Sequence, residues 1–215
     1  ELARERIVPR ATARPGTGLL VHVEGLGRSD ALVTVDDGRG RPTTLRLSPR
    51  HSEILVLLAS APSGLTGDEL SVLLYDQEET APSTLRAELN RMRGLLGEQL
   101  LASRPYRLTG RVTTDWTAVE APLAAADLRS AVRGYRGPLL PRSSAPGIER
   151  VRGDLEAGLR QALVRSRQAD LMAAWTRSAW GRDDYEMWSA QREVAGRPSP
   201  MLPLLEGQLA RRERA

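Results

Sequence analysis

The sequence contains no cysteine, no lysine and no phenylalanine, and only two of its 215 residues are histidines. The absence of cysteine excludes disulfide bonds, thiolate nucleophiles and cysteine-based zinc sites. The two histidines, His22 and His51, are too far apart in the chain to make a histidine-rich metal site. We therefore expect no metal site and no other cofactor.

Long hydrophobic runs and enzyme motifs are also missing. No stretch of eighteen apolar residues occurs, and the first residues, ELARERIVPR, lack the apolar centre of a signal peptide. We therefore expect a cytoplasmic protein without a membrane span. No Gly-x-Gly-x-x-Gly, Walker loop or Gly-x-Ser-x-Gly occurs, and the carboxylate pair Asp183-Asp184 falls at a turn or helix start, where Asp is ordinary. We expect no enzymatic activity.

The charges are unevenly distributed along the chain. All 31 basic residues are arginine, a bias typical of GC-rich coding, so arginine abundance and the net charge of +4 say little about partners. Residues 66–80, however, carry five acids and no base, whereas residues 81–111 carry six arginines against two glutamates. The basic charge is therefore concentrated on one predicted helix and the segment after it.

The order of predicted elements indicates an α+β protein with two domains after a linker at residues 1–17. Extended runs at residues 18–24, 31–35 and 43–47 predict a small N-terminal antiparallel sheet. Ser48-Pro49 predicts a helix start, and Thr66 with Glu69 predicts a capping box on a second helix. We place the first domain at residues 18–116 and an all-α, TPR-like bundle at residues 117–215, where Trp175, Trp180 and Trp188 are expected in the core.

The stretch APSTLRAELNRMRGLLG predicts a third helix over residues 81–96. At 100° per residue, Leu85, Leu89, Met92 and Leu96 fall within an arc of about 60°, which is typical of a helix packed on a core. The opposite side and its flanks carry small, amide and arginine side chains: Ser83, Arg86, Ala87, Asn90, Arg91 and Arg93. Two short extended runs within residues 100–110 then predict a hairpin.

This order resembles the OmpR/PhoB-type winged helix-turn-helix domain. The family's third helix has apolar residues spaced four, three and four apart with an arginine beside the third, and Leu85, Leu89, Met92-Arg93 and Leu96 resemble this pattern. The family's wing ends in an aromatic residue, Arg and Leu, which Tyr106-Arg107-Leu108 resembles. The segment RGYRGPLLPRSSAPGIERVRGDLEAGLRQAL resembles the bacterial transcriptional activation domain of SARP-type regulators. The chain also resembles the C-terminal part of actinobacterial regulators with an N-terminal GAF sensor, which would account for a first residue that is Glu rather than Met.

The resemblance implies a sequence-specific transcriptional regulator whose helix at residues 81–96 enters the major groove of DNA. The expected partners are double-stranded DNA and, as a candidate, RNA polymerase, which the acidic loop YDQEET would touch unless it is only a solvated turn. A homodimer or tandem binding on DNA is expected. The predicted DNA-binding residues are Ser83, Arg86, Ala87, Asn90, Arg91 and Arg93 on the helix, and Arg104 and Arg107 on the wing.

Two alternatives remain open at the level of sequence. Arg104 and Arg107 are equally compatible with contacts to DNA and with a solvated strand edge. Glu88 would repel phosphate unless it is paired, for instance with Arg91 or Arg93. The chain as a whole is also compatible with a protein-interaction module in which the helical bundle is the active surface and the winged domain is a scaffold.

Overall fold

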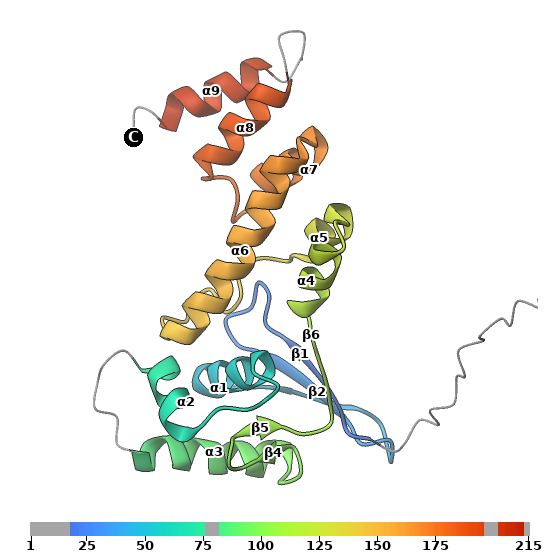
Figure 1. The fold of residues 1–215 in the computed structure, drawn as a ribbon, viewed down its shortest axis with the longest axis vertical. Helices are drawn as coiled ribbons and strands as arrows, with labels where there is room; N and C mark the ends of the chain where they lie inside the picture. The colour runs from blue at the N-terminus through green and yellow to red at the C-terminus, as the bar shows by residue number, and fades with distance from the viewer. Residues whose placement is uncertain (1–17, 76–81, 196–201, 213–215) are drawn as a thin grey trace, which may run out of the picture.

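The computed structural model describes residues 18–75, 82–195 and 202–212 (Figure 1). The protein is α+β, with a small N-terminal sheet followed by helices, as the sequence predicts. The predicted linker at residues 1–17 and all of the acidic loop YDQEET except Tyr75 lie outside the described residues. The roles predicted for these two segments therefore remain predictions from the sequence.

The main sheet has four strands in the order β3-β2-β1-β6. Its strands are β1 (Leu20–Glu24), β2 (Leu32–Asp36), β3 (Thr43–Arg46) and β6 (Arg111–Thr114). The first three pair antiparallel as predicted, but β6 pairs parallel to β1, with Val112 opposite Val21. The sheet is therefore mixed: its three predicted strands are antiparallel as expected, and β6 is an additional strand that the sequence did not indicate. The chain can return in the parallel direction because three helices and a hairpin separate β6 from the other strands.

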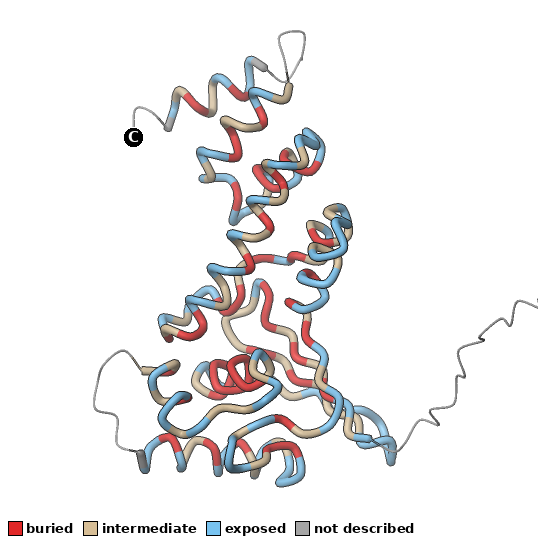
Figure 2. The backbone as a smooth tube through the Cα atoms, viewed as in Figure 1, coloured by how far each residue is buried: buried red, intermediate tan, exposed pale blue. Residues whose placement is uncertain are grey.

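Helix α1 (Pro49–Ser60) is the central helix of the N-terminal half. Ser48 caps it by accepting a hydrogen bond from the backbone N–H of His51, and Pro49 occupies its first turn, as predicted. Every residue from His51 to Leu58 is buried (Figure 2). A helix buried on all sides is covered by other elements around its whole circumference.

Helix α2 (Gly67–Leu74) begins with the predicted capping box. The Thr66 hydroxyl accepts from the Glu69 backbone N–H, and the Glu69 carboxylate accepts from the Thr66 backbone N–H at 2.8 Å. These hydrogen bonds, first of all the one from the backbone of Thr66, hold the pKa of Glu69 below its ordinary value. Both partners satisfy backbone groups that the start of a helix leaves unpaired.

Helix α3 (Pro82–Leu96) precedes a hairpin made of β4 (Leu101–Ala102) and β5 (Arg107–Leu108). The hairpin lies at the C-terminal end of α3 (Figure 1). Leu65 and Tyr106 exchange backbone hydrogen bonds of 2.9 and 2.8 Å, so the hairpin is also attached to the segment between α1 and α2. The hairpin is therefore held from two sides.

The C-terminal half consists of helices in the described residues: α4 (Thr117–Ala124), α5 (Leu128–Gly134), α6 (Pro146–Ser166), α7 (Ala169–Thr176), α8 (Tyr185–Ala195) and α9 (Leu202–Arg212). Helices α4 and α5 were expected as one helical run. Ala126, with φ +59°, interrupts the run, and Asp127 then caps α5 by accepting from the Ser130 backbone N–H. An Asp cap starts a new helix where the backbone has left the helical region.

Helix α6 connects the two halves. Its N-terminal end packs against α1 and α2, and its other end reaches α7 and α8 (Figure 1). Gly147 makes the close approach possible, since a Cβ at this position would lie 2.9 Å from the Leu73 Cβ and 3.0 Å from the Leu73 carbonyl oxygen. Buried residues of both halves form one continuous cluster that includes Trp116, so a domain boundary at residue 116 stays a prediction.

Asp184 ties three helices together at the far end of α6. Its carboxylate accepts from the Arg160 guanidinium at 2.6 and 2.8 Å, from the Trp175 indole N–H at 2.9 Å and from the Met187 backbone N–H at 3.1 Å. Burial alone would raise the pKa of Asp184, but these hydrogen bonds outweigh it and leave the pKa below its ordinary value. The ionised carboxylate is therefore part of the folded structure.

Candidate nucleic-acid interface

The inner face of α3 is the one that the sequence predicts. Leu85, Leu89 and Met92 are buried, and Leu96 is half-buried against the same core. Because these positions fix the rotation of the helix about its axis, the residues between them face outward. The core packing of α3 thus decides which side chains form the candidate interface.

The predicted DNA-binding residues of α3 divide into exposed and half-buried positions. Ser83, Arg86, Asn90 and Arg91 are exposed, whereas Ala87 and Arg93 are half-buried. On the hairpin, Arg104 and Arg107 are both exposed. The helix and the hairpin therefore bring most of the predicted site residues to the surface, with Arg93 as the arginine that turns partly inward.

Glu88 is paired on both of its oxygens. Its Oε1 accepts from Arg91 Nη1 at 2.5 Å, and its Oε2 lies 2.9 Å from His51 Nε2. An ionised carboxylate only accepts hydrogen bonds, so His51 donates from Nε2 in this contact. Of the two partners that the sequence offers for Glu88, Arg91 is the one that pairs with it, while the contact from α1 through His51 had no signal in the sequence.

Arg93 joins α3 to the hairpin. Its Nη2 donates to the Ser103 hydroxyl at 2.7 Å, its Nε donates to the Leu101 carbonyl at 3.4 Å, and its Nη1 donates to the Asn90 side-chain oxygen at 2.9 Å. The guanidinium also lies 6.0 Å from the centre of the Tyr106 ring, within the range of a cation–π contact. Arg93 therefore positions the hairpin and occupies one side of Asn90.

Other arginines in residues 81–111 have no side-chain partner in the part of the chain that the structure describes. Within residues 18–75, 82–195 and 202–212, the side chains of Arg86, Arg104, Arg107 and Arg111 make no hydrogen bond and no ion pair. None of these guanidinium groups is therefore in an ion pair with a described residue. Such guanidinium groups keep all five N–H donors available for an external acceptor.

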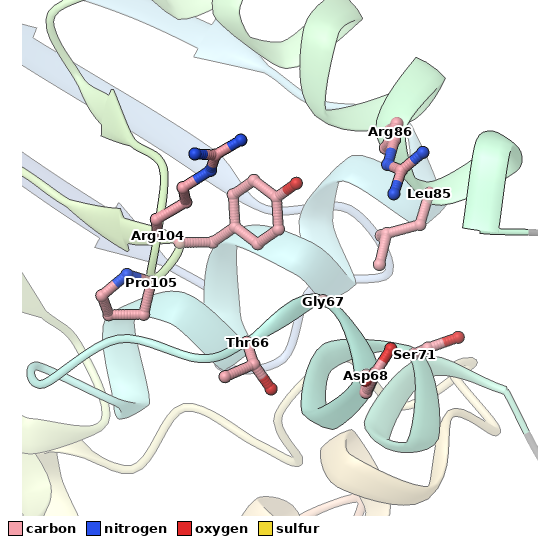
Figure 3. A pocket seen from close by; sticks show the side chains of 9 residues that line it. Thr66, Gly67, Asp68, Ser71, Leu85, Arg86, Arg104 and Pro105 are labelled. Atoms are coloured by element: carbon pink, nitrogen blue, oxygen red, sulfur yellow. The ribbon is translucent and has the colours of Figure 1, made fainter.

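A groove of about 640 Å³ lies between α2, α3 and the hairpin. Figure 3 shows Arg104 and Pro105 on one side of this groove, Leu85 and Arg86 on another, and Thr66, Asp68 and Ser71 along the start of α2. The groove is open to solvent between two of the unpaired arginines. It separates the basic surface of α3 from that of the hairpin tip.

Replacing Arg93 with alanine is expected to loosen the hairpin. The change removes its hydrogen bonds to Ser103 and Leu101, each worth about 1 kcal/mol. Backbone amides of residues 101–108 should then exchange with deuterium about 5- to 30-fold faster, because a local opening that is about 1 to 2 kcal/mol easier is more populated by that factor. Hydrogen exchange followed by mass spectrometry measures this, with Arg91→Ala as the matched control. Equal exchange in both variants would contradict the positioning role.

Other classes of site find little support in the described residues. Among them, no group of three or more His, Asp or Glu side chains is placed to hold a metal ion. A search of the same residues finds no helix long and apolar enough to cross a membrane. The basic surface on α3 and the hairpin therefore remains the candidate site.

Comparison with known proteins gives two similarities. Residues 168–215 match the family model of the YTH3-like protein, third C-terminal helical domain. An uncharacterized 47.3 kDa protein from the thcA 5' region of Rhodococcus erythropolis is 42% identical over 178 residues, which make up 80% of this chain and 40% of that protein. The chain thus spans well under half of that relative's length. No solved structure is significantly similar to the chain.

Proposed function

We propose that the chain binds double-stranded DNA in a sequence-specific way and regulates transcription, as a winged helix-turn-helix protein of the OmpR/PhoB type. In this proposal α3 enters the major groove, where an α-helix fits and base edges are distinguishable. The β4–β5 hairpin is the wing, and Arg104 and Arg107 reach the neighbouring phosphate backbone or minor groove.

The observation that carries the proposal is the set of exposed arginines shared by α3 and the hairpin. Arg86, Arg104 and Arg107 have no partner among the described residues, although they belong to two separate elements. Helix α3 is anchored by buried Leu89 and Met92, so its outer face is rigid. A rigid helix with unpaired guanidinium groups suits contacts to phosphates and to guanine O6 and N7.

The direct test is selection of binding sites from random-sequence duplexes, followed by titration of the purified chain at several salt concentrations. We expect one sequence to be enriched and the logarithm of its affinity to fall linearly with the logarithm of salt, with a slope of about −0.9 per phosphate neutralised. A chain that enriches no sequence and binds no duplex at low salt would contradict the proposal.

Variants of the unpaired arginines sharpen this test. Arg86→Ala combined with Arg104→Ala should reduce the magnitude of the salt slope by about 2 and lower the affinity for all duplexes. Arg150 and Arg165, which are exposed on α6, provide the control, since Arg150→Ala combined with Arg165→Ala removes the same number of positive charges away from the proposed interface. Equal losses in the Arg150/Arg165 and Arg86/Arg104 variants would mean that only net charge matters.

The helical half is proposed to contact another protein, either a second copy of the chain or RNA polymerase. The supporting observation is an exposed aromatic side chain: Trp180 is 38% exposed beside Tyr135, with ring centres 5.7 Å apart. Exposed aromatic groups are common at protein interfaces. Sedimentation of the chain with and without the selected duplex tests pairing of copies, and a complex with one chain per site would argue against it.

A further inference from the structure

We propose that Glu88 is a specificity-determining residue, which holds Arg91 in place for a base and disfavours binding to phosphate alone. The proposal rests on DNA binding by α3 as put forward above. It concerns the contact network that joins α1 to α3 through His51, Glu88 and Arg91. An acid on a DNA-binding face needs a reason, because by itself it repels the phosphate backbone.

One end of this network lies in the buried core of the protein. The side chain of His51 is 9% exposed, that of Glu88 is 20% exposed and that of Arg91 is 65% exposed. His51 belongs to the buried segment of α1, so its ring is fixed by packing. The exposed fraction of the side chain rises stepwise from His51 through Glu88 to Arg91. Because His51 holds Glu88 in one conformation, Glu88 in turn restricts the conformations of Arg91.

The contact with His51 sets this pair apart from an ordinary surface pair. Solvent-exposed ion pairs between residues three apart on a helix contribute little, partly because two long side chains must be ordered. Here one oxygen of Glu88 is already held by His51 at 2.9 Å before Arg91 binds the other. Arg91 therefore meets a carboxylate with a fixed position.

This arrangement leaves part of the Arg91 guanidinium free in a defined orientation. Glu88 engages Nη1, so the edge formed by Nε and Nη2 remains available as a two-donor fork. Such a fork matches the O6 and N7 acceptors of guanine. The carboxylate also offsets the charge of Arg91, so a phosphate gains less from this pair than from a lone arginine. The pair thus favours a base over a phosphate.

The test compares Glu88→Gln with Glu98→Gln, using a duplex selected by the wild-type chain and a random-sequence duplex. Both changes remove one negative charge from the same basic segment, and Glu98 is exposed with no described partner. Glu88→Gln should raise the affinity for random duplex about threefold and lower the preference for the selected duplex about tenfold. Glu98→Gln should leave that preference unchanged.

Two further variants exclude a trivial loss of folding. Arg91→Lys keeps the charge and leaves His51 and Glu88 intact, but lacks the planar fork, so it should keep the affinity for random duplex and lose about tenfold in preference. In an Arg91→Ala background, Glu88→Gln should change the preference no further, since the two residues act as a unit. Melting curves confirm that the variants are folded.

The outcomes separate this inference from the proposed function. If the wild-type chain prefers one duplex but Glu88→Gln and Glu98→Gln affect that preference equally, Glu88 only lowers the net charge and the inference fails alone. An unchanged preference in Arg91→Lys has the same meaning. If the wild-type chain prefers no duplex at any salt concentration, DNA binding and the role of Glu88 fail together.

Discussion

Gly147→Ala is expected to lower the free energy of unfolding by about 2 kcal/mol, although alanine is the better helix former. The new Cβ would lie 2.9 Å from the Leu73 Cβ and 3.0 Å from the Leu73 carbonyl oxygen, so α6 and α2 must move apart. The displaced contact lies within the core that both halves share. Urea unfolding followed by circular dichroism measures the change.

Gly153 in the same helix provides a matched control. A Cβ at Gly153 would have no neighbour within 4 Å, so Gly153→Ala should raise the free energy of unfolding by as much as about 1 kcal/mol. The two alanine substitutions are therefore expected to have opposite signs. A Gly147→Ala variant that is as stable as Gly153→Ala would show that α6 does not rest on α2 in solution.

Asp184→Asn is expected to lower the free energy of unfolding by about 3 kcal/mol near neutral pH. The Asp184 side chain is 9% exposed and faces the Arg160 guanidinium, which would keep only its contact with the exposed carboxylate of Glu186. Removing one member of a buried ion pair costs about 3–5 kcal/mol, and the value here is at the lower end because Arg160 is 36% exposed. Asparagine can still accept the hydrogen bond from the Met187 N–H, but the favourable negative charge at the N-terminus of α8 is lost.

The same substitution should flatten the acid dependence of stability. The pKa of Asp184 is lower in the folded state than its ordinary 3.8, so its contribution is complete above that value and is lost as the pH falls through the lower folded pKa. Urea unfolding at pH 7 and at pH 3 should therefore show a smaller difference for Asp184→Asn than for the wild-type chain. The neighbouring Asp183, 83% exposed, is the control, and Asp183→Asn should change stability by less than about 0.5 kcal/mol. Similar effects of both substitutions would contradict the role of Asp184.

Features that depend on neighbouring residues could be predicted from the sequence. The caps at Ser48 and Thr66 were identified because a capping side chain and its backbone partner lie within three residues. The buried side of α3 followed from the spacing of its apolar residues, which is a property of the helix itself. The positions facing outward on α3 were fixed in the same step.

Features that depend on distant segments could not be predicted in this way. Strand β6 has only four residues, and its parallel partner β1 lies about ninety residues earlier, so no hairpin signal marks the pair. The contact between His51 and Glu88 spans 37 residues. In the sequence, nothing distinguishes Arg93 from Arg86 and Arg91 on the same helix. Its contact with Ser103 depends on where the hairpin lies in the fold.

The tryptophans of the helical half show where helical spacing in the sequence stops predicting burial. Trp175 and Trp188 are buried, as predicted, but Trp180 is 38% exposed. Trp180 follows the end of α7 rather than continuing it, so helical spacing no longer decides its direction. The prediction that it belongs to the core is therefore wrong for much of its surface.

The position of α6 gives the protein a mechanical linkage. The helix has 21 residues and is therefore about 31 Å long, with no proline inside it to act as a kink. One end rests on α2, the helix just before α3 in the chain, and the other end meets α7 and α8. A ligand that binds near α7 and α8 and tilts α6 would therefore also shift or strain the packing of α6 on α2. By thermodynamic reciprocity, if such a ligand changes the affinity of the proposed DNA binding by some factor, DNA changes the affinity for that ligand by the same factor.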